Sequence, residues 1–413
     1  MPTVLFLGAS VSQLAAIRQA RASGWRVVAV DADPHAVGFA EADATEAVDF
    51  TDVDRVVEIA RAHKVNAVVA ISTDRAVPVA AAVADRLGLP GIGPETARVM
   101  TDKAAMRTRL EEHAIPQPAF AVLTDEVDPT WQLEAVGRPA VLKPIDSGGQ
   151  RGVYRIDDHA ALVEHLPLTL GFSRGRRAIL ERYIEGQELN GIVVARDGEP
   201  VLLTLSDRLR PPGAGFGVGW IHLYPSSLGA TYLKNAEDVA LAAVRALGLR
   251  DGIAFPQLLV TDRGEVFAVE VAARIPAGQM ADLVRLATGV DLVEIALMQA
   301  LGTPVPDAMV EPRFHRPIAV SFLTASPGIL PTGTVLAVDG LEEMRAAPGV
   351  LEADLYIELG ETIHPVQVDA DRRGYVIATA DNPLDALELA RRATHRLRVE
   401  ATEPITRMLG GGD

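Results

Sequence analysis

Short apolar segments alternate with alanine-rich segments over the first 95 residues of the chain. The apolar runs have the length and β-branched content of buried strands, and the alanine-rich runs have helical spacing. The strands are expected at 3–8, 26–33 and 66–71, and the helices at 12–24, 53–64 and 76–88. Strands and helices that alternate in this way form a parallel sheet covered by helices. The chain is therefore predicted to begin with an α/β domain, residues 1–95.

The rest of the chain is predicted to form four further parts, which makes the fold class α/β with added α+β modules. A helical connector ends at two prolines, and a small α+β module follows it. A larger block then contains a glycine- and proline-rich loop at 211–219 and a hairpin at 252–274. In the last piece, Asp381 or Asn382 is expected to cap a helix that has Pro383 in its first turn. The predicted boundaries of these parts are 96–118, 119–186, 187–305 and 306–413.

Composition excludes several classes of protein. The 413 residues include no cysteine, which rules out disulfides, thiolate metal sites and cysteine nucleophiles. A net charge of −16 without a basic run disfavours nucleic-acid binding. The first residues carry no basic region, and no apolar run approaches about 18 residues, so we expect neither a signal peptide nor a membrane span. Together these features predict a cytoplasmic globular protein without nucleic-acid or membrane partners.

Lysine is rare in this chain. Of 39 basic residues only four are lysines, namely Lys64, Lys103, Lys143 and Lys234. A chain that otherwise uses arginine is expected to keep lysine where a compact and flexible charge is needed. Each of the four lysines is therefore a candidate for function, although a surface lysine without a role is an equally ordinary outcome.

The stretch "FAVEVAARIPAGQ" places two charges in an apolar strand. Glu270 and Arg274 each need a partner or a ligand, because burying an unpaired charge is costly. Gln257 on the preceding strand is expected to lie opposite Glu270, and two such oxygen ligands suit Mg²⁺ beside a triphosphate. Residues four apart on a strand share a face, so Glu270 and Arg274 could line one cavity. The alternative is a structural salt bridge between these two side chains.

The stretch "VLKPIDSGGQRGVYRI" joins a lysine to a flexible turn. Lys143 lies on a strand, and Ser147, Gly148 and Gly149 follow it. Such a turn can direct its backbone N–H groups at phosphate oxygens while the lysine neutralises them. The alternative is an ordinary glycine hairpin with an exposed lysine.

Two further segments suggest a nucleotide. In "ILERYIEGQELN", Glu181 at a strand end could accept a hydrogen bond from an adenine amino group, and Glu188 could hold ribose hydroxyls; solvated carboxylates are the alternative. Near the N-terminus, Gly8 ends a strand and Asp31 ends the next, a spacing that suggests NAD. That loop has one glycine where a dinucleotide fingerprint needs three, so a Rossmann-like turn facing a small substrate is favoured.

Taken in order, these segments resemble the ATP-grasp superfamily over roughly residues 1–305. The resemblance implies a Rossmann-like N-terminal domain, a mobile lid and a C-terminal half, with ATP held between two antiparallel sheets. It implies ATP and Mg²⁺ as cofactors, with Mn²⁺ as a substitute, small-molecule carboxylate and amine substrates, and a homodimer as one oligomeric state. The ATP-binding residues that it implies are Lys103, Lys143, Ser147, Gly148, Gly149, Glu181, Tyr183, Ile184, Glu188 and Leu259.

The resemblance also assigns the metal and substrate sites. Gln257 and Glu270 match the Mg²⁺ ligands, and Arg274 matches the arginine that faces the reacting phosphoryl and acyl groups, as catalytic and substrate-binding residue. Many members carry an asparagine as a third metal ligand where this chain has Ala272. The form "EVAARIPAG" is similar to the L-amino-acid ligase subgroup, as are the tail at 312–402 and "GWIHLYPSSL". This similarity adds His222, Ser226 and Gly278 as substrate-binding residues.

The function that the sequence favours is an ATP-dependent carboxylate–amine ligase. It would form an amide or peptide bond through an acylphosphate, release ADP and phosphate, and act on amino acids or related small acids. Three alternatives stay open. They are a bicarbonate-using carboxylase or carbamoyl-phosphate-type enzyme, an NAD-dependent dehydrogenase, and a catalytically silent ATP-binding regulator.

Overall fold

A computed structural model describes residues 1–125, 129–210, 213 and 216–402. The chain forms two compact units, each built from two separate stretches. The first contains Met1–Ser206 and Ser226–His315, and the second contains Asp207–Pro225 and Arg316–Asp413. Part of the predicted loop at 211–219 lies outside the described residues. The division into five parts stays a prediction.

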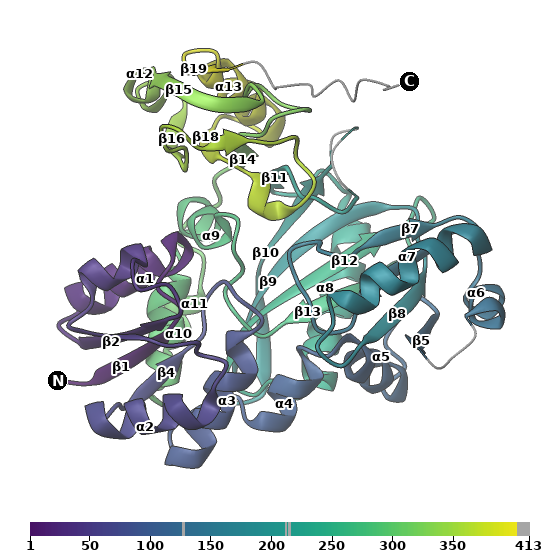
Figure 1. Ribbon diagram of the computed structural model, residues 1–413, viewed down its shortest axis with the longest axis horizontal. Coiled ribbons are helices and arrows are strands. Elements are labelled where there is room, and N and C mark those ends of the chain that lie inside the picture. Colours follow the sequence, from purple (N-terminus) through teal and green to yellow (C-terminus); the bar gives the residue numbers. More distant parts are fainter. Residues whose placement is uncertain (126–128, 211–212, 214–215, 403–413) are drawn as a thin grey trace, which may run out of the picture. The chain divides into compact units, whose positions relative to one another are not determined.

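The N-terminal α/β prediction is confirmed. Four parallel strands lie in the order β3-β2-β1-β4, and helices connect them (Figure 1). The sequence did not predict β3, a short strand whose side chains are half-buried or exposed, because it lacks an apolar run. The elements are β1 (Thr3–Leu7), α1 (Val11–Ala22), β2 (Arg26–Asp31), β3 (Ala44–Ala47), α2 (Val53–His63), β4 (Ala67–Val69) and α3 (Ala76–Leu87).

The predicted connector contains two helices, α4 (Pro94–Val99) and α5 (Lys103–Glu112). Asp102 separates them, because its side chain accepts a hydrogen bond from the Ala105 N–H (2.9 Å) and thereby begins α5. This cap fixes Lys103 as the first residue of a helix.

A four-stranded antiparallel sheet follows, in the order β5-β8-β6-β7. Helices α6 and α7 pack on it around a core of leucines, valine, isoleucine and alanines. Its elements are β5 (Phe120–Thr124), α6 (Thr130–Val136), β6 (Ala140–Pro144), β7 (Tyr154–Ile156), α7 (His159–Gly171) and β8 (Arg177–Arg182). The three strands predicted in this segment are confirmed.

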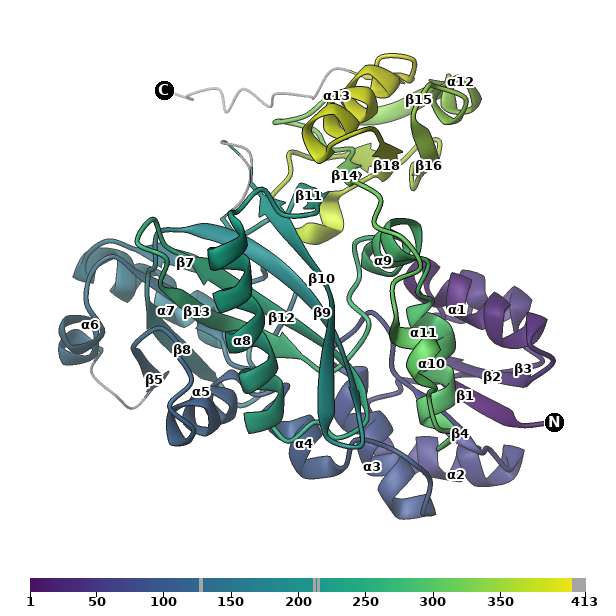
Figure 2. The same cartoon turned by 180° about the vertical axis from the view of Figure 1, so that it is seen from behind.

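The remainder of the first unit is a second antiparallel sheet with the strand order β13-β12-β9-β10. Helix α8 packs against β9, β12 and β13 (Figure 2). The elements are β9 (Gln187–Arg196), β10 (Glu199–Leu209), α8 (Ala230–Ala246), β12 (Gly252–Val260), β13 (Val266–Ala272), α9 (Met280–Thr288), α10 (Leu292–Ala300) and α11 (Asp307–Val310).

The second unit is the α+β piece predicted at the C-terminal end, joined by a strand from earlier in the chain. The last residues of β10 pair with β11, and β14, β18 and β16 continue that sheet. A three-stranded sheet has the order β17-β15-β19. Of the two predicted caps, Asp381 and Asn382, it is Asn382 that caps the last helix. The elements are β11 (Ile221–Tyr224), β14 (Ile318–Phe322), β15 (Gly333–Asp339), α12 (Leu341–Arg345), β16 (Val350–Leu355), β17 (Thr362–Ile363), β18 (Gly374–Thr379), α13 (Pro383–Thr394) and β19 (Arg398–Ala401).

Within the described ranges, every helix is too short or too polar to cross a bilayer.

Candidate active site

The hairpin of β12 and β13 carries the predicted metal ligands. Gln257 and Glu270 are cross-strand partners in the antiparallel register, which confirms that they lie opposite each other. The register shifts directly after this pair, between Gln257 and Leu258, so the bulge lies next to the candidate ligands. The Glu270 side chain keeps 27% of its surface exposed, which leaves its carboxylate accessible to a ligand.

Lys103 lies beside that carboxylate. Its Nζ is 3.4 Å from Glu270 Oε1 and donates a hydrogen bond to the Ser147 carbonyl (3.0 Å). Burial alone would lower the pKa of Lys103, but Glu270 and Asp74 outweigh it and the pKa is raised. A charged lysine, the carboxylate predicted to bind the metal and the glycine loop therefore meet at one point.

The glycine loop needs its glycines for two different reasons. Gly149 has a positive φ of 70°, which L side chains rarely adopt. Gly148 lies so close to Asp74 that an added Cβ would be 2.9 Å from Asp74 Oδ2. Together with the hydrogen bond from Lys103 to Ser147, this contact brings the whole loop against the candidate site.

Arg274 is paired with Asp74. Its Nε donates to Oδ1 (2.6 Å) and its Nη2 donates to Oδ2 (2.7 Å). Burial would raise the pKa of Asp74, but Arg274 and Lys103 hold it below its usual value. Sequence reasoning missed Asp74, although it follows β4 closely and Arg274 required a partner.

This pairing corrects two expectations about Arg274. Strand β13 ends at Ala272, so Arg274 does not lie on the same strand face as Glu270. The chain turns away because the Ser72 N–H donates to the Ile275 carbonyl (3.1 Å), which attaches this segment to the loop after β4. The alternative of a Glu270–Arg274 salt bridge is wrong, since each side chain pairs with another residue.

A second charged group is buried at the sheet β5-β8-β6-β7, which forms the predicted lid and is called the lid sheet below. Lys143 Nζ lies 2.7 Å from Glu181 Oε2, and Arg107 Nε lies 2.8 Å from Glu181 Oε1. Burial would raise the pKa of Glu181, but the two cations lower it to about 2. Burial, together with Arg107 and Lys103, lowers the pKa of Lys143. The lid lysine is thus held by the carboxylate that was expected to bind adenine.

Arg107 was not predicted from the sequence. It is 1% exposed and lies one turn after Lys103 on helix α5. Besides Glu181 of β8, its Nη1 donates to the Ala268 carbonyl (2.8 Å) and its Nη2 donates to the Val269 carbonyl (2.6 Å). Arg107 therefore joins the lid sheet to the strand that carries Glu270.

The low pKa of Glu181 predicts a specific loss of stability in acid. A carboxyl whose pKa is depressed on folding stabilises the protein above its unfolded pKa of 4.5, and this contribution is lost as the pH falls towards 2. Between about pH 6 and about pH 3.5, we expect the unfolding free energy of the wild type to fall by on the order of 1 kcal/mol more than that of Glu181→Gln. Urea titrations at several pH values measure both. Identical pH dependences in the two proteins would contradict the assignment.

The residues predicted to bind adenine and ribose lie directly after β8 of the lid sheet and on β9 and β12 of the second sheet. Tyr183 and Ile184 directly follow β8 and line a cavity of about 450 Å³ together with Phe267 of β13. The Arg155 guanidinium lies 4.8 Å above the Tyr183 ring. Glu188 and Leu259 are cross-strand partners on β9 and β12. Their contact with a nucleotide stays a prediction.

The predicted substrate residues are not brought together in one unit. His222 lies on β11 in the second unit, where burial and then Arg208 and Arg372 hold its pKa well below the usual value. Ser226 and Gly278 belong to the first unit. Ser226 accepts a hydrogen bond from the Leu228 N–H (3.2 Å). Their roles towards a substrate stay predictions.

The residues fit a magnesium ion that takes some of its ligands from the protein and the others from phosphate. Within the part of the chain that the structure describes, no three acidic or histidine side chains cluster to hold a metal alone. Gln257 and Glu270 are paired across the hairpin and each offers a side-chain oxygen, and Lys103 beside Glu270 suits a phosphate oxygen. Mg²⁺ commonly takes its remaining ligands from phosphate and water, so this pair is a suitable donor set.

The chain matches two family models. One is described as an ATP-grasp domain and matches residues 136–282, and the other is described as L-amino acid ligase C-terminal domain 2 and matches residues 328–402. A D-alanine–D-alanine ligase of Gloeobacter violaceus is 31% identical over 229 residues, covering 51% of this chain and 72% of that protein. The L-arginine-specific L-amino acid ligase of Bacillus subtilis is 24% identical, covering 68% of this chain and 67% of that protein.

A solved structure agrees in fold. The L-amino acid ligase from Bacillus licheniformis matches with a TM-score of 0.82 at 19% identity, covering 98% of this chain and 99% of that one. The chain belongs to the ATP-grasp superfamily and is an ATP-dependent ligase that forms carbon–nitrogen bonds. Within the superfamily it resembles the L-amino acid ligases. The chain spans 63% of the length of a similar protein of Sinorhizobium fredii. It spans 90% of the length of the formate-dependent phosphoribosylglycinamide formyltransferase of Ignicoccus hospitalis.

Proposed function

We propose that this chain is an ATP-dependent carboxylate–amine ligase that joins amino acids or related small acids. The γ-phosphoryl group of ATP is transferred to a carboxylate, which gives an acylphosphate and ADP. An amine then attacks the acyl carbon, phosphate leaves, and an amide forms. The observation that carries this proposal is the meeting of Lys103, the Ser147–Gly149 loop, Glu270 and the Arg274–Asp74 pair at one place.

The two lysines are proposed to exchange their carboxylate partners for phosphate when ATP binds. Lys103 leaves Glu270 for a phosphate oxygen, which frees that carboxylate. Lys143 leaves Glu181, which Arg107 still neutralises. Without Arg107, the departure of Lys143 would leave a buried unpaired carboxylate, which is costly. Glu181, Tyr183, Ile184 and Leu259 are then proposed to surround the adenine, and Glu188 to bind the ribose.

The metal and the catalytic arginine act on the other end of the nucleotide. Mg²⁺, when bound, neutralises the charge of the triphosphate. Gln257 and Glu270 are the side chains proposed to hold it. Arg274, oriented by the bidentate hydrogen bonds to Asp74, is proposed to stabilise the charge that develops on the phosphoryl and acyl oxygens. His222, Ser226 and Gly278 are proposed to contact the substrates.

ATP consumption tests this reaction. With the correct pair of amino acids, we expect one ADP and one phosphate for each amide formed, because the lysines and the glycine loop address the γ-phosphoryl end. The measurement is a phosphate-release screen of amino-acid pairs, with mass spectrometry of the products. The L-amino acid ligase match at 328–402 supports screening amino acids first.

Three outcomes would contradict the proposal. AMP as the nucleotide product would mean that the carboxylate is adenylated. Release of ADP with bicarbonate and no amino acid would favour a carboxylase. ATP binding without turnover on any substrate would favour a regulator, for which Ala272 in place of a third metal ligand is the sequence argument.

A further inference from the structure

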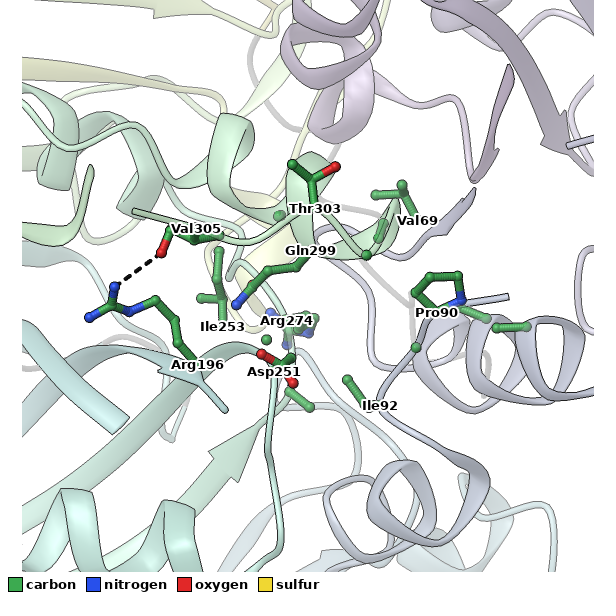
Figure 3. A pocket seen from close by; sticks show the side chains of 18 of the residues that line it. Val69, Pro90, Ile92, Arg196, Asp251, Ile253, Arg274, Gln299, Thr303 and Val305 are labelled. Atoms are coloured by element: carbon green, nitrogen blue, oxygen red, sulfur yellow. Dashed lines mark hydrogen bonds between the residues drawn. The ribbon is translucent and has the colours of Figure 1, made fainter. Parts of the chain in front are cut away.

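A cavity of about 840 Å³ adjoins the segment that carries Arg274 (Figure 3). Ala273 and Ile275, the neighbours of Arg274 in the chain, also line it, so the cavity is not a site apart from the candidate active site. The two candidate metal ligands do not line it. The groups that support these ligands are therefore found on the sheet itself, where Asn190 of β9 has no role in the reaction described so far.

Asn190 lies directly beside the candidate metal ligands in the sheet. It is the cross-strand partner of Gln257, which is in turn the cross-strand partner of Glu270. Residues opposite each other on antiparallel strands share a face, with Cβ atoms about 4.5–5.5 Å apart. The other face packs against α8 through Leu189 and Leu258, the chain neighbours of Asn190 and Gln257. The three polar side chains therefore form a row on the face that carries the candidate metal site.

Burial distinguishes the two ends of this row. The Glu270 side chain keeps 27% of its surface exposed, whereas Asn190 is 1% exposed. Ser206 of β10 lies against Asn190, and its hydroxyl donates to the Asn190 carbonyl (3.4 Å). A ligand that shares Mg²⁺ with phosphate and water has to be accessible to them. Glu270 meets that requirement, and the enclosed position of Asn190 suits a residue that holds a ligand in place.

Gln257 is the ligand that needs such support. A carboxylate presents an oxygen in either orientation, but an amide presents an oxygen in one orientation and an NH₂ group in the other. Among the described residues, no hydrogen bond holds the Gln257 amide. Its orientation towards a cation therefore depends on an acceptor that takes its NH₂ group when the metal is bound. Metal ligands are commonly oriented by hydrogen bonds of this kind.

We propose that Asn190 is a positioning residue for the metal ligand Gln257. When the metal is bound, Gln257 Nε2 donates to Asn190 Oδ1, which turns Gln257 Oε1 towards the cation. An amide suits this buried position because it accepts the hydrogen bond without adding a charge, which would be costly to bury. The inference rests on the proposed function, since it takes Gln257 as a ligand of the metal.

Binding of a metal–nucleotide complex tests this role without any amide formation. The probe is the Mn²⁺ complex of a non-hydrolysable ATP analogue, and the same analogue in EDTA gives the affinity without metal. Asn190→Leu removes the acceptor at similar size and is expected to weaken binding of the Mn²⁺ complex about tenfold, with the metal-free affinity unchanged. Combined with Gln257→Glu, the same substitution should weaken it less than about twofold, because a carboxylate needs no orientation. Isothermal titration calorimetry measures the wild type, both single variants and the double variant.

Thr204→Val is the matched control. Thr204 is 2% exposed and lies on β10, one strand further from Gln257, and its neighbour Leu205 packs with α8, so Thr204 shares the face of Asn190. Its substitution should leave the affinity for the Mn²⁺ complex within about twofold of the wild type. An equal loss in Asn190→Leu and Thr204→Val would show a structural effect of this buried row and would overturn the proposal.

Two further outcomes separate this inference from the proposed metal site. If Asn190→Leu weakens binding equally with and without Gln257→Glu, Asn190 does not act through Gln257 and the proposal is wrong. If Gln257→Leu binds the Mn²⁺ complex as tightly as the wild type, the metal-ligand assignment itself is wrong. Weaker binding in Gln257→Leu with unchanged binding in Asn190→Leu would contradict only the positioning role. Circular dichroism verifies the fold, and Asn190→Ala serves for the same comparison if the leucine variant does not fold.

Discussion

Arg274→Ala is expected to lower the rate of amide formation by about 10²–10³-fold while ATP binding is retained. That is the typical cost of removing one preorganised donor from a charge that develops in the transition state. Arg274 has only 13% of its side-chain surface exposed and is held by two hydrogen bonds to Asp74, so it is oriented before substrate arrives. Arg274→Lys should lower the rate of amide formation less, since a lysine keeps the charge but cannot span two oxygens. The measurement is single-turnover amide formation, with ATP affinity measured separately.

The control for this variant is Arg98→Ala. Arg98 donates to Glu95 through the same two nitrogens that Arg274 uses, but 57% of its side chain is exposed. We expect its activity to be close to that of the wild type. Glu270→Ala should instead weaken binding of ATP with Mg²⁺. If folded Arg274→Ala keeps near-normal specific activity and loses only thermal stability, the Asp74–Arg274 pair is structural and the catalytic role is wrong.

Arg107→Met should destabilise the protein by about 3–5 kcal/mol, the usual cost of removing one partner from a buried ion pair. Glu181 would keep only Lys143, and the Ala268 and Val269 carbonyls would lose their donors. ATP affinity should fall as well, because Lys143 can no longer leave Glu181 without exposing an uncompensated charge. Urea unfolding and nucleotide titration measure the two effects.

Arg109→Met is the matched control on the same helix. Arg109 pairs with Glu95 (3.1 Å) and Glu112 (3.4 Å) at the surface, where such pairs contribute roughly 0–1 kcal/mol. If the two substitutions lowered the free energy of unfolding by similar amounts, Arg107 would be a packing residue of α5 and not the charge that joins the two sheets.

Local patterns in the sequence predicted most of the elements near the site. Apolar residues that alternate as in strands predicted the β12–β13 hairpin, and strand and helix patterns in turn predicted the N-terminal α/β domain. The position of Gln257 opposite Glu270 in that hairpin followed from strand pairing alone. The cap at Asn382 also followed from local chemistry, since its side chain bonds only three residues ahead.

Long-range pairing could not be predicted in the same way. Asp74 and Arg274 are separated by 200 residues, and Arg107 and Val269 by 162. Their contact depends on how sheets pack, which no local period encodes. Arg107 did carry one usable signal, because it lies four residues after Lys103 and therefore on the same face of α5. The end of β13 at Ala272 depended on a hydrogen bond to the loop after β4, so the strand was predicted too long.

The second unit has a consequence for synthesis on the ribosome. Strand β11 begins at Ile221, and its partner β14 begins at Ile318, 97 residues later (318 − 221). At roughly 5–20 residues per second, β11 waits about 5–20 s for that partner to be made. During this interval one edge of β11 is unpaired, and Ile221, Leu223 and Tyr224, which are buried in the finished protein, lack that cover. The nascent chain is therefore open to chaperone binding and aggregation at a strand of four residues, long before its last helix exists.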